Sequence, residues 1–168
     1  MVAFSTMDRL DVIEIAWRRE RPDVDVKPLI LIGRLLRTAS LIDVQLADGL
    51  AEFDLQPGWF DVLAALRRAG KPYQLNPTQL MQATMLSSAG MTKRLDRMTE
   101  ADLVERHSDP SDRRGTLVRL TRRGLRTIDA ALPVHVRNEA RVLGALSAGE
   151  RRALNELLRK LSADMDDG

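Results

Sequence analysis

The chain has no cysteine and few aromatic residues, and these absences exclude several classes of function. Without cysteine there is no disulfide, no thiol nucleophile and no thiolate metal site. The two histidines, His107 and His135, leave few candidates for an all-histidine zinc site or a catalytic triad. The longest apolar run, residues 28–33, is too short to cross a bilayer, and the N-terminus lacks the pattern of a secretory signal. We therefore expect a cytoplasmic protein that is not an enzyme and that holds no metal and no cofactor.

The chain as a whole also lacks a strong charge of either sign, since 26 Lys and Arg residues stand against 24 Asp and Glu residues. One segment departs from this balance. Residues 103–126 contain seven arginines and three acidic residues, which gives a local charge of +4. A basic segment in a nearly neutral chain indicates either a polyanion that is contacted at one place or a solvated helix face.

Hydrophobic periodicity and capping residues predict a mainly α protein with one small β-hairpin. Helices are expected over residues 7–19, 28–53, 58–69, 76–83 and 89–101, followed by one capped by Thr121, in which Pro133 should produce a kink, and one opened by a capping box at 147–150. Two short strands are expected at 103–107 and 116–120, joined by a polar turn at 108–115. We predict three parts, which are N-terminal helices (1–56), a middle lobe (57–124) and C-terminal helices (125–168).

The order helix, short helix, helix and hairpin in residues 57–124 is that of a winged helix-turn-helix, with residues 88–101 as the recognition helix. Its exposed side offers hydroxyl groups and cations that suit phosphates and base edges in a major groove. An arginine on the narrow wing tip suits the minor groove, with Asp112 as a brace for the turn. Gly90, which is costly inside a helix, indicates a close approach of another backbone or of DNA. The predicted contacts to double-stranded DNA are Ser88, Thr92, Lys93, Arg97, Arg113 and Arg114.

The N-terminal and C-terminal helices carry apolar faces that the small middle lobe is too small to cover. Soluble monomers avoid large exposed apolar patches. We therefore expect a homodimer built from both ends of the chain, with a two-fold axis that presents two winged lobes to a palindromic operator.

Three stretches, at residues 103–106, 109–115 and 118–124, resemble the wing signature of the MarR family of bacterial transcription regulators. The resemblance implies a triangular helical dimer with winged helix-turn-helix lobes. It also implies that Arg114 enters the minor groove and that Asp112 braces it. The chain departs from the family at Ala101-Asp102, where a glycine is usual, so we expect Asp102 to supply a left-handed residue there.

An unusual charge lies on the predicted inward face of the recognition helix. Met91, Leu95 and Met98 mark this face, and Arg94 falls on it as well. A buried guanidinium is costly unless it is paired. Asp61, the ionisable residue in the otherwise apolar stretch 55–66, is a plausible partner. Such a pair either belongs to a binding site or only fixes the orientation of the two helices.

An early helix bearing Trp17, together with Asp61, Arg94 and Arg106, resembles the urate-responsive branch of the family, the HucR and PecS type. The resemblance implies a urate pocket formed by these four residues. In it, Arg106 neutralises the anion, Trp17 stacks on it or bonds to it, and Asp61 accepts from its N–H groups. Arg94 connects the ligand to the recognition helix.

The sequence therefore predicts a sequence-specific DNA-binding regulator, a repressor, whose operator affinity is lowered by urate or a related small anion. Two other functions stay open, namely a ligand-independent architectural DNA-binding protein and a sensor of a phenolic or other organic acid. An enzyme acting on an oxidised purine, with Asp61 as its base, is disfavoured because metal ligands and a nucleophile are missing.

Overall fold

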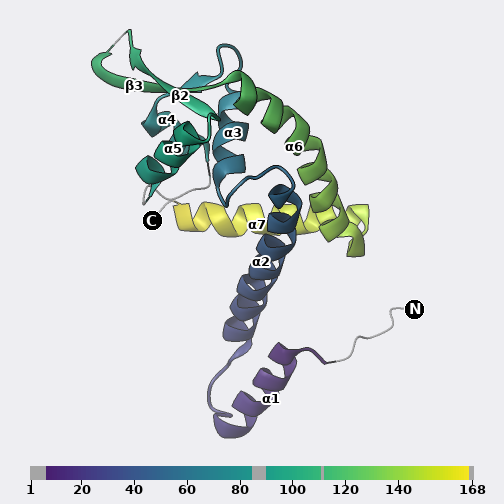
Figure 1. The fold of residues 1–168 in the computed structure, drawn as a ribbon. Coiled ribbons are helices and arrows are strands. Elements are labelled where there is room, and N and C mark those ends of the chain that lie inside the picture. The colour runs from purple at the N-terminus through teal and green to yellow at the C-terminus, as the bar shows by residue number, and fades with distance from the viewer. Residues whose placement is uncertain (1–6, 85–89, 111, 167–168) are drawn as a thin grey trace. The chain divides into compact units, whose positions relative to one another are not determined.

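The computed structural model describes residues 7–84, 90–110 and 112–166, and leaves the side chains of residues 112–114 outside the description. The chain divides into two compact units, residues 1–45 and 46–168, which we describe separately. The helices are α1 (Arg9–Glu20), α2 (Lys27–Ala51), α3 (Trp59–Arg68), α4 (Pro77–Ala83), α5 (Met91–Glu100), α6 (Arg122–Val142), the 3-10 turn η1 (Leu143–Ala145) and α7 (Ala148–Asp166). The strands are β1 (Gln74–Leu75), β2 (Val104–Asp109) and β3 (Asp112–Leu120) (Figure 1). The predicted fold class, mainly helical with a small sheet and a winged helix-turn-helix, is confirmed.

In the first unit, α1 is fastened to the first half of α2 by charged residues at its start. Asp8 caps α1, since its carboxylate accepts from the N–H groups of Leu10 and Asp11. Arg34 of α2 makes ion pairs with Asp8 at 3.2 Å and with Asp11 at 2.8 Å. Leu10 lies against Gly33, where an added Cβ would be 3.3 Å from the leucine side chain. These contacts place the start of α1 beside the middle of α2.

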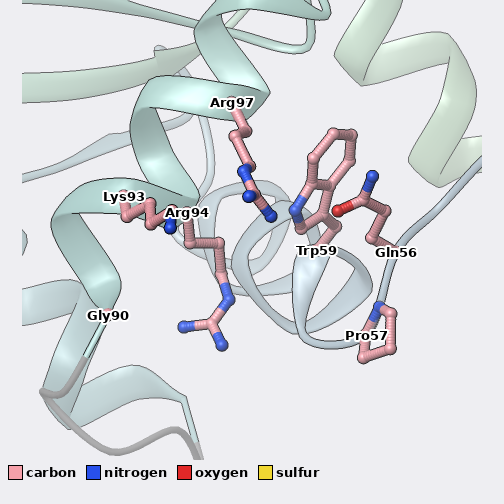
Figure 2. A pocket seen from close by; sticks show the side chains of 7 residues that line it. All are labelled: Gln56, Pro57, Trp59, Gly90, Lys93, Arg94 and Arg97. Atoms are coloured by element: carbon pink, nitrogen blue, oxygen red, sulfur yellow. The ribbon is translucent and has the colours of Figure 1, made fainter.

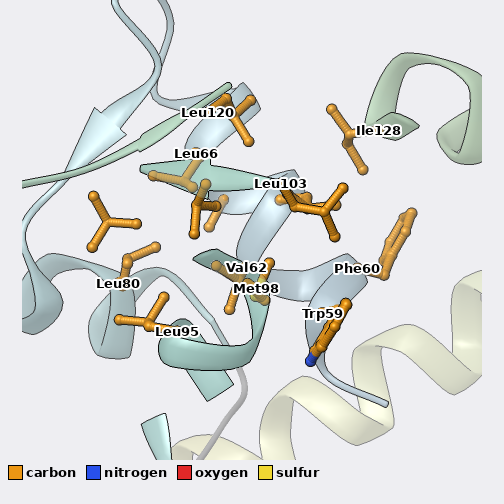
Figure 3. Packing of buried hydrophobic residues seen from close by; sticks show 14 of the residues in the cluster. Trp59, Phe60, Val62, Leu66, Leu80, Leu95, Met98, Leu103, Leu120 and Ile128 are labelled. Atoms are coloured by element: carbon orange, nitrogen blue, oxygen red, sulfur yellow. The ribbon is translucent and has the colours of Figure 1, made fainter. Parts of the chain in front are cut away.

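The hydrophobic core of the second unit lies around α3. The buried side chains of this helix recur every three to four residues and so form one face. Val62, Leu63 and Leu66 of this helix have no exposed surface. Figure 3 shows Val62 and Leu66 with side chains from α5, the sheet and α6. The cluster also contains Leu80, Leu95, Met98, Leu103, Leu120 and Ile128. Each surrounding element buries one face against α3. The recognition helix and the base of the wing are therefore both packed on α3.

The sheet differs from the prediction in two ways. A short strand, β1, pairs with β3 antiparallel, so the strand order is β1-β3-β2. The predicted turn at 108–115 is also too long, because ladder pairing continues through Ser108↔Thr116 to Asp109↔Asp112. Polar residues extend these strands because both faces of a two-stranded ribbon are open to water, and the alternation that reveals a strand is then missing.

Two residues with left-handed backbone conformation border the recognition helix. Gly90 precedes α5 as its N-cap with a φ of 86°, and an added Cβ would meet nothing within 4 Å. Gly90 therefore lies before the helix and not inside it, and its left-handed backbone conformation is a sufficient reason for glycine. The predicted close approach of DNA stays a prediction. Asp102 has a φ of 55°, as the sequence predicts.

The wing meets α6 through backbone contacts at Leu103. Thr121 caps α6 by accepting from the N–H of Gly124, and its hydroxyl donates to the carbonyl oxygen of Asp102 at 2.6 Å. A Cβ at Gly124 would overlap the carbonyl oxygen of Leu103 and lie 2.9 Å from its carbonyl carbon. A backbone carbonyl cannot move aside as a flexible side chain can. Only glycine fits at this position.

We therefore expect Gly124→Ala to lower the free energy of unfolding by roughly 3 kcal/mol, the upper end of overpacking costs. Chemical denaturation followed by circular dichroism measures this change. Gly144→Ala is the control, since an added Cβ there meets nothing within 4 Å. Equal stability of the two variants would contradict the packing described here.

Candidate functional site

The recognition helix α5 presents one face to the core and another to solvent. Met91, Leu95 and Met98 are at most 4% exposed, which confirms the predicted inward face. The opposite side carries Thr92, Lys93 and Arg97 among its exposed residues. Ser88, the remaining predicted contact on this helix, lies outside the described residues. The exposed face therefore offers one hydroxyl and two cations in adjacent turns.

The wing is formed by β2 and β3, and Figure 1 shows the hairpin extending beyond the helices of its own unit. The backbone of Asp112, Arg113 and Arg114 belongs to β3. Their side chains lie outside the description, so their roles at the wing tip stay predictions. The hairpin supplies the kind of narrow projection that enters a minor groove.

Three arginines of the basic segment hold the recognition helix, the wing and α6 together. Arg106 of β2 pairs with Asp96 of α5 at 2.7 Å. Arg119 of β3 donates to Glu105 of β2 at 2.8 Å. Arg123 of α6 donates to the carbonyl oxygen of Ala101 at 3.0 Å, where α5 ends. Part of the local positive charge is therefore engaged in contacts within the lobe.

Glu105 lies between two basic side chains at the base of the wing. His107 Nε2 is 3.1 Å from its carboxylate, and Arg119 donates to the same oxygen. Hydrogen bonding to His107 and then to Arg119 lowers the pKa of Glu105. The carboxylate is therefore charged at neutral pH and neutralises this part of the sheet.

Arg94 does not pair with Asp61. Within the described chain no ion pair joins these residues, although both are partly buried. The guanidinium of Arg94 instead lies over Gly58, where an added Cβ would be 2.9 Å from Nε. Its Nη1 atom is buried and has no hydrogen-bond partner within residues 7–84, 90–110 and 112–166. The absent side chain at Gly58 leaves room for the guanidinium of Arg94 at the start of α3.

A cavity of about 260 Å³ lies where the start of α3 meets α5. Figure 2 shows Arg94 and Arg97 extending from α5, with Trp59 of α3 beside Arg97. Gln56, Pro57, Trp59, Gly90, Lys93, Arg94 and Arg97 line the cavity. The sequence pointed to Arg94 but not to Trp59, which its apolar surroundings mark only as a core residue. The glycine before α3 was the available signal that a side chain passes close to this point.

The four predicted ligand residues are not brought into one cavity by the described contacts. Trp17 is 43% exposed on α1 and belongs to the first unit, whereas the other three belong to the second. Asp61 and Arg106 are absent from the lining of the cavity at Arg94. Arg106 has Asp96 as its partner. The role of these residues in ligand binding stays a prediction.

Comparison with known proteins identifies the family. Residues 53–115 match the sequence pattern of the MarR family. The chain is 38% identical over 154 residues to the HTH-type transcriptional regulator PecS of Dickeya dadantii, across 90% of this chain and 93% of that protein. No described helix combines the length and apolar composition needed to cross a membrane.

Solved structures agree with this assignment. A mutant MarR from E. coli complexed with operator DNA matches with a TM-score of 0.72 and 28% identity, over 82% of this chain and 99% of that chain. BpsR of Bordetella bronchiseptica, whose DNA binding is regulated by 6-hydroxynicotinic acid, matches with a TM-score of 0.71 and 29% identity, over 78% and 92% of the two chains. The chain belongs to the MarR family of DNA-binding transcription regulators, which are not enzymes.

Proposed function

We propose that this regulator is a repressor whose affinity for its operator falls when urate or a related small organic anion binds. The observation that carries the proposal is the side chain of Arg94 on the recognition helix, whose buried Nη1 has no hydrogen-bond partner in the described part of the chain. A buried donor without an acceptor is costly, and an anion relieves this cost. Because Arg94 belongs to α5, an anion that binds it acts directly on the element that reads DNA.

The proposed ligand contacts are those that the family resemblance implies, namely Trp17, Asp61, Arg94 and Arg106. Arg106 is paired with Asp96, so an anion reaches it by replacing that carboxylate. Such a replacement breaks a link between α5 and the wing. The 38% identity to PecS over most of the chain supports this assignment. The regulation of BpsR by 6-hydroxynicotinic acid supports the other candidate, a different aromatic acid.

We also propose that the regulator binds double-stranded, palindromic operator DNA as a homodimer. Apolar side chains are exposed on helices of both units, which indicates surfaces that a second copy covers. In the first unit they include Leu29, Ile32 and Leu36, and in the second Leu157, Leu158 and Leu161. The exposure of Thr92, Lys93 and Arg97 supports their placement at the DNA.

Removal of residues 146–168 is expected to abolish both the dimer and operator binding, because the exposed leucines of α7 are lost. Analytical ultracentrifugation measures the first effect and a gel shift measures the second. A truncated protein that sediments as a dimer would exclude α7 from the interface.

Arg114→Ala is expected to weaken operator binding, because a wing-tip arginine neutralises phosphate charge in the minor groove. The slope of log affinity against log salt concentration should fall by about 0.9 for each lost phosphate contact. Binding measured by fluorescence anisotropy at several salt concentrations gives this slope. An unchanged affinity and slope would mean that the wing tip does not contact DNA.

Arg106→Ala is expected to retain most operator affinity but to need roughly ten- to a hundredfold more urate for release, since a charge-assisted contact is worth about 1.5–3 kcal/mol. Trp17→Phe should give a smaller shift, because an aromatic ring remains. Asp61→Asn should change the urate response, because it replaces one of the two acceptor oxygens of the carboxylate with an N–H donor and removes the negative charge. Gel shifts across a urate series measure all three.

Asp96→Ala is the matched control, because it breaks the same ion pair as Arg106→Ala but leaves the cation in place. If Arg106 anchors the ligand, Asp96→Ala keeps or strengthens the urate response. If the two variants lose the response equally, the ion pair acts only through the position of the wing and Arg106 is not a ligand contact.

A further inference from the structure

The cavity at the start of α3 collects positive charge without an acidic counterpart. Lys93, Arg94 and Arg97 line it, and none of the described lining residues carries a carboxylate. The stretch 85–89, which precedes Gly90 in the sequence, contains no ionisable residue. Lys93 and Arg97 are four residues apart on α5, a spacing at which like charges destabilise a helix. These cations therefore lack the compensation that ion pairs give elsewhere in the unit.

The backbone of α3 adds to the same potential. The helix begins at Trp59, and Gly58, its N-cap, has no side chain with which to accept from the first N–H groups. Residues 56, 57 and 59 line the cavity, so the positive end of the α3 dipole lies at its wall. Helix N-termini of this kind favour phosphate and carboxylate groups when side-chain cations accompany them.

Arg94 supplies the specific donor. Its guanidinium is held over Gly58, which has a φ of 76° and leaves room that a Cβ would fill. Its Nη1 is buried and has no hydrogen-bond partner among the residues that the structure describes. A planar guanidinium in a fixed position offers paired N–H groups to oxygen acceptors on a phosphate.

We infer that this cavity binds a small anion of the phosphate class, carrying two or more negative charges, and that its occupant and operator DNA exclude each other. Three cations and a helix N-terminus suit an anion that carries more than one negative charge. The second part of this inference, that the anion releases DNA, rests on the proposed function. It adds a ligand class and three residues, Trp59, Lys93 and Arg97, that the proposed urate site does not use.

The anion and operator DNA exclude each other because two side chains are needed by both. Lys93 and Arg97 line the cavity and also lie on the exposed face of α5 that is proposed to meet DNA. An anion bound between them neutralises the charge that attracts DNA phosphates. The release of DNA then needs no change in the fold of the lobe.

Pyrophosphate is the probe, and Trp59 is the reporter, because the chain has only two tryptophans and Trp17→Phe leaves Trp59 alone. The titration is made without DNA, at a constant ionic strength set with potassium chloride. We expect a saturable change in tryptophan emission. Calorimetry with the unmodified chain repeats the measurement, so that the result does not depend on the Trp17 substitution.

Arg94→Gln is expected to raise the dissociation constant of pyrophosphate at least tenfold, and Lys93→Gln or Arg97→Gln severalfold. Arg159→Gln is the control, since it removes an equal charge from an exposed position on α7. An equal effect of Arg159→Gln, or no saturable binding to the unmodified chain, would overturn the inference.

A gel shift at constant ionic strength then tests exclusion. We expect pyrophosphate to release operator DNA from the unmodified chain at concentrations that match its measured affinity. If Arg94→Gln weakens DNA binding and its salt slope while pyrophosphate does not bind, the cavity holds a phosphate of the DNA backbone and the inference is wrong. Simultaneous binding of pyrophosphate and DNA would also overturn it. Loss of the urate response with pyrophosphate binding intact would contradict only the proposed urate function.

Discussion

Burial of one face of α5 is the constraint on which the DNA-binding lobe depends. Met91, Leu95 and Met98 lie in the core that surrounds α3, and full burial of such a side chain contributes about 1.5–3 kcal/mol. Rotation of α5 about its axis would expose these side chains. The helix is therefore held with Lys93 and Arg97 facing outward. The residues proposed to contact DNA therefore owe their position to the buried face of the same helix.

Arg94 lies at the border between these two faces, which explains its unusual contacts. Its stem leaves α5 near the core, and its guanidinium passes over Gly58 to reach a cavity. An anion there changes the charge of the DNA-reading helix without disturbing the packed leucines and methionines. Coupling energies between two sites in one protein are typically about 1–3 kcal/mol, within the range of a single charge-assisted contact.

Three arginines at the base of the wing make different kinds of contact. Arg106 and Arg119 pair with acids, and Arg123 binds the carbonyl end of α5. These three arginines, and the close approach of Gly124 to Leu103, connect the recognition helix, the hairpin and α6. The recognition helix and the wing are therefore held in a defined arrangement relative to each other.

The sequence alone determined the helices, the inward face of α5, the cap at Thr121 and the left-handed Asp102, and all of these are present. Each depends on residues within about one helical turn, and such local preferences are legible in a single chain. Only the tertiary structure decided that Arg106 meets Asp96, that Arg94 passes Gly58, and that β1 joins the sheet. A charge in a folded chain has several possible partners, and its choice depends on distances between elements far apart in sequence, which no periodicity records.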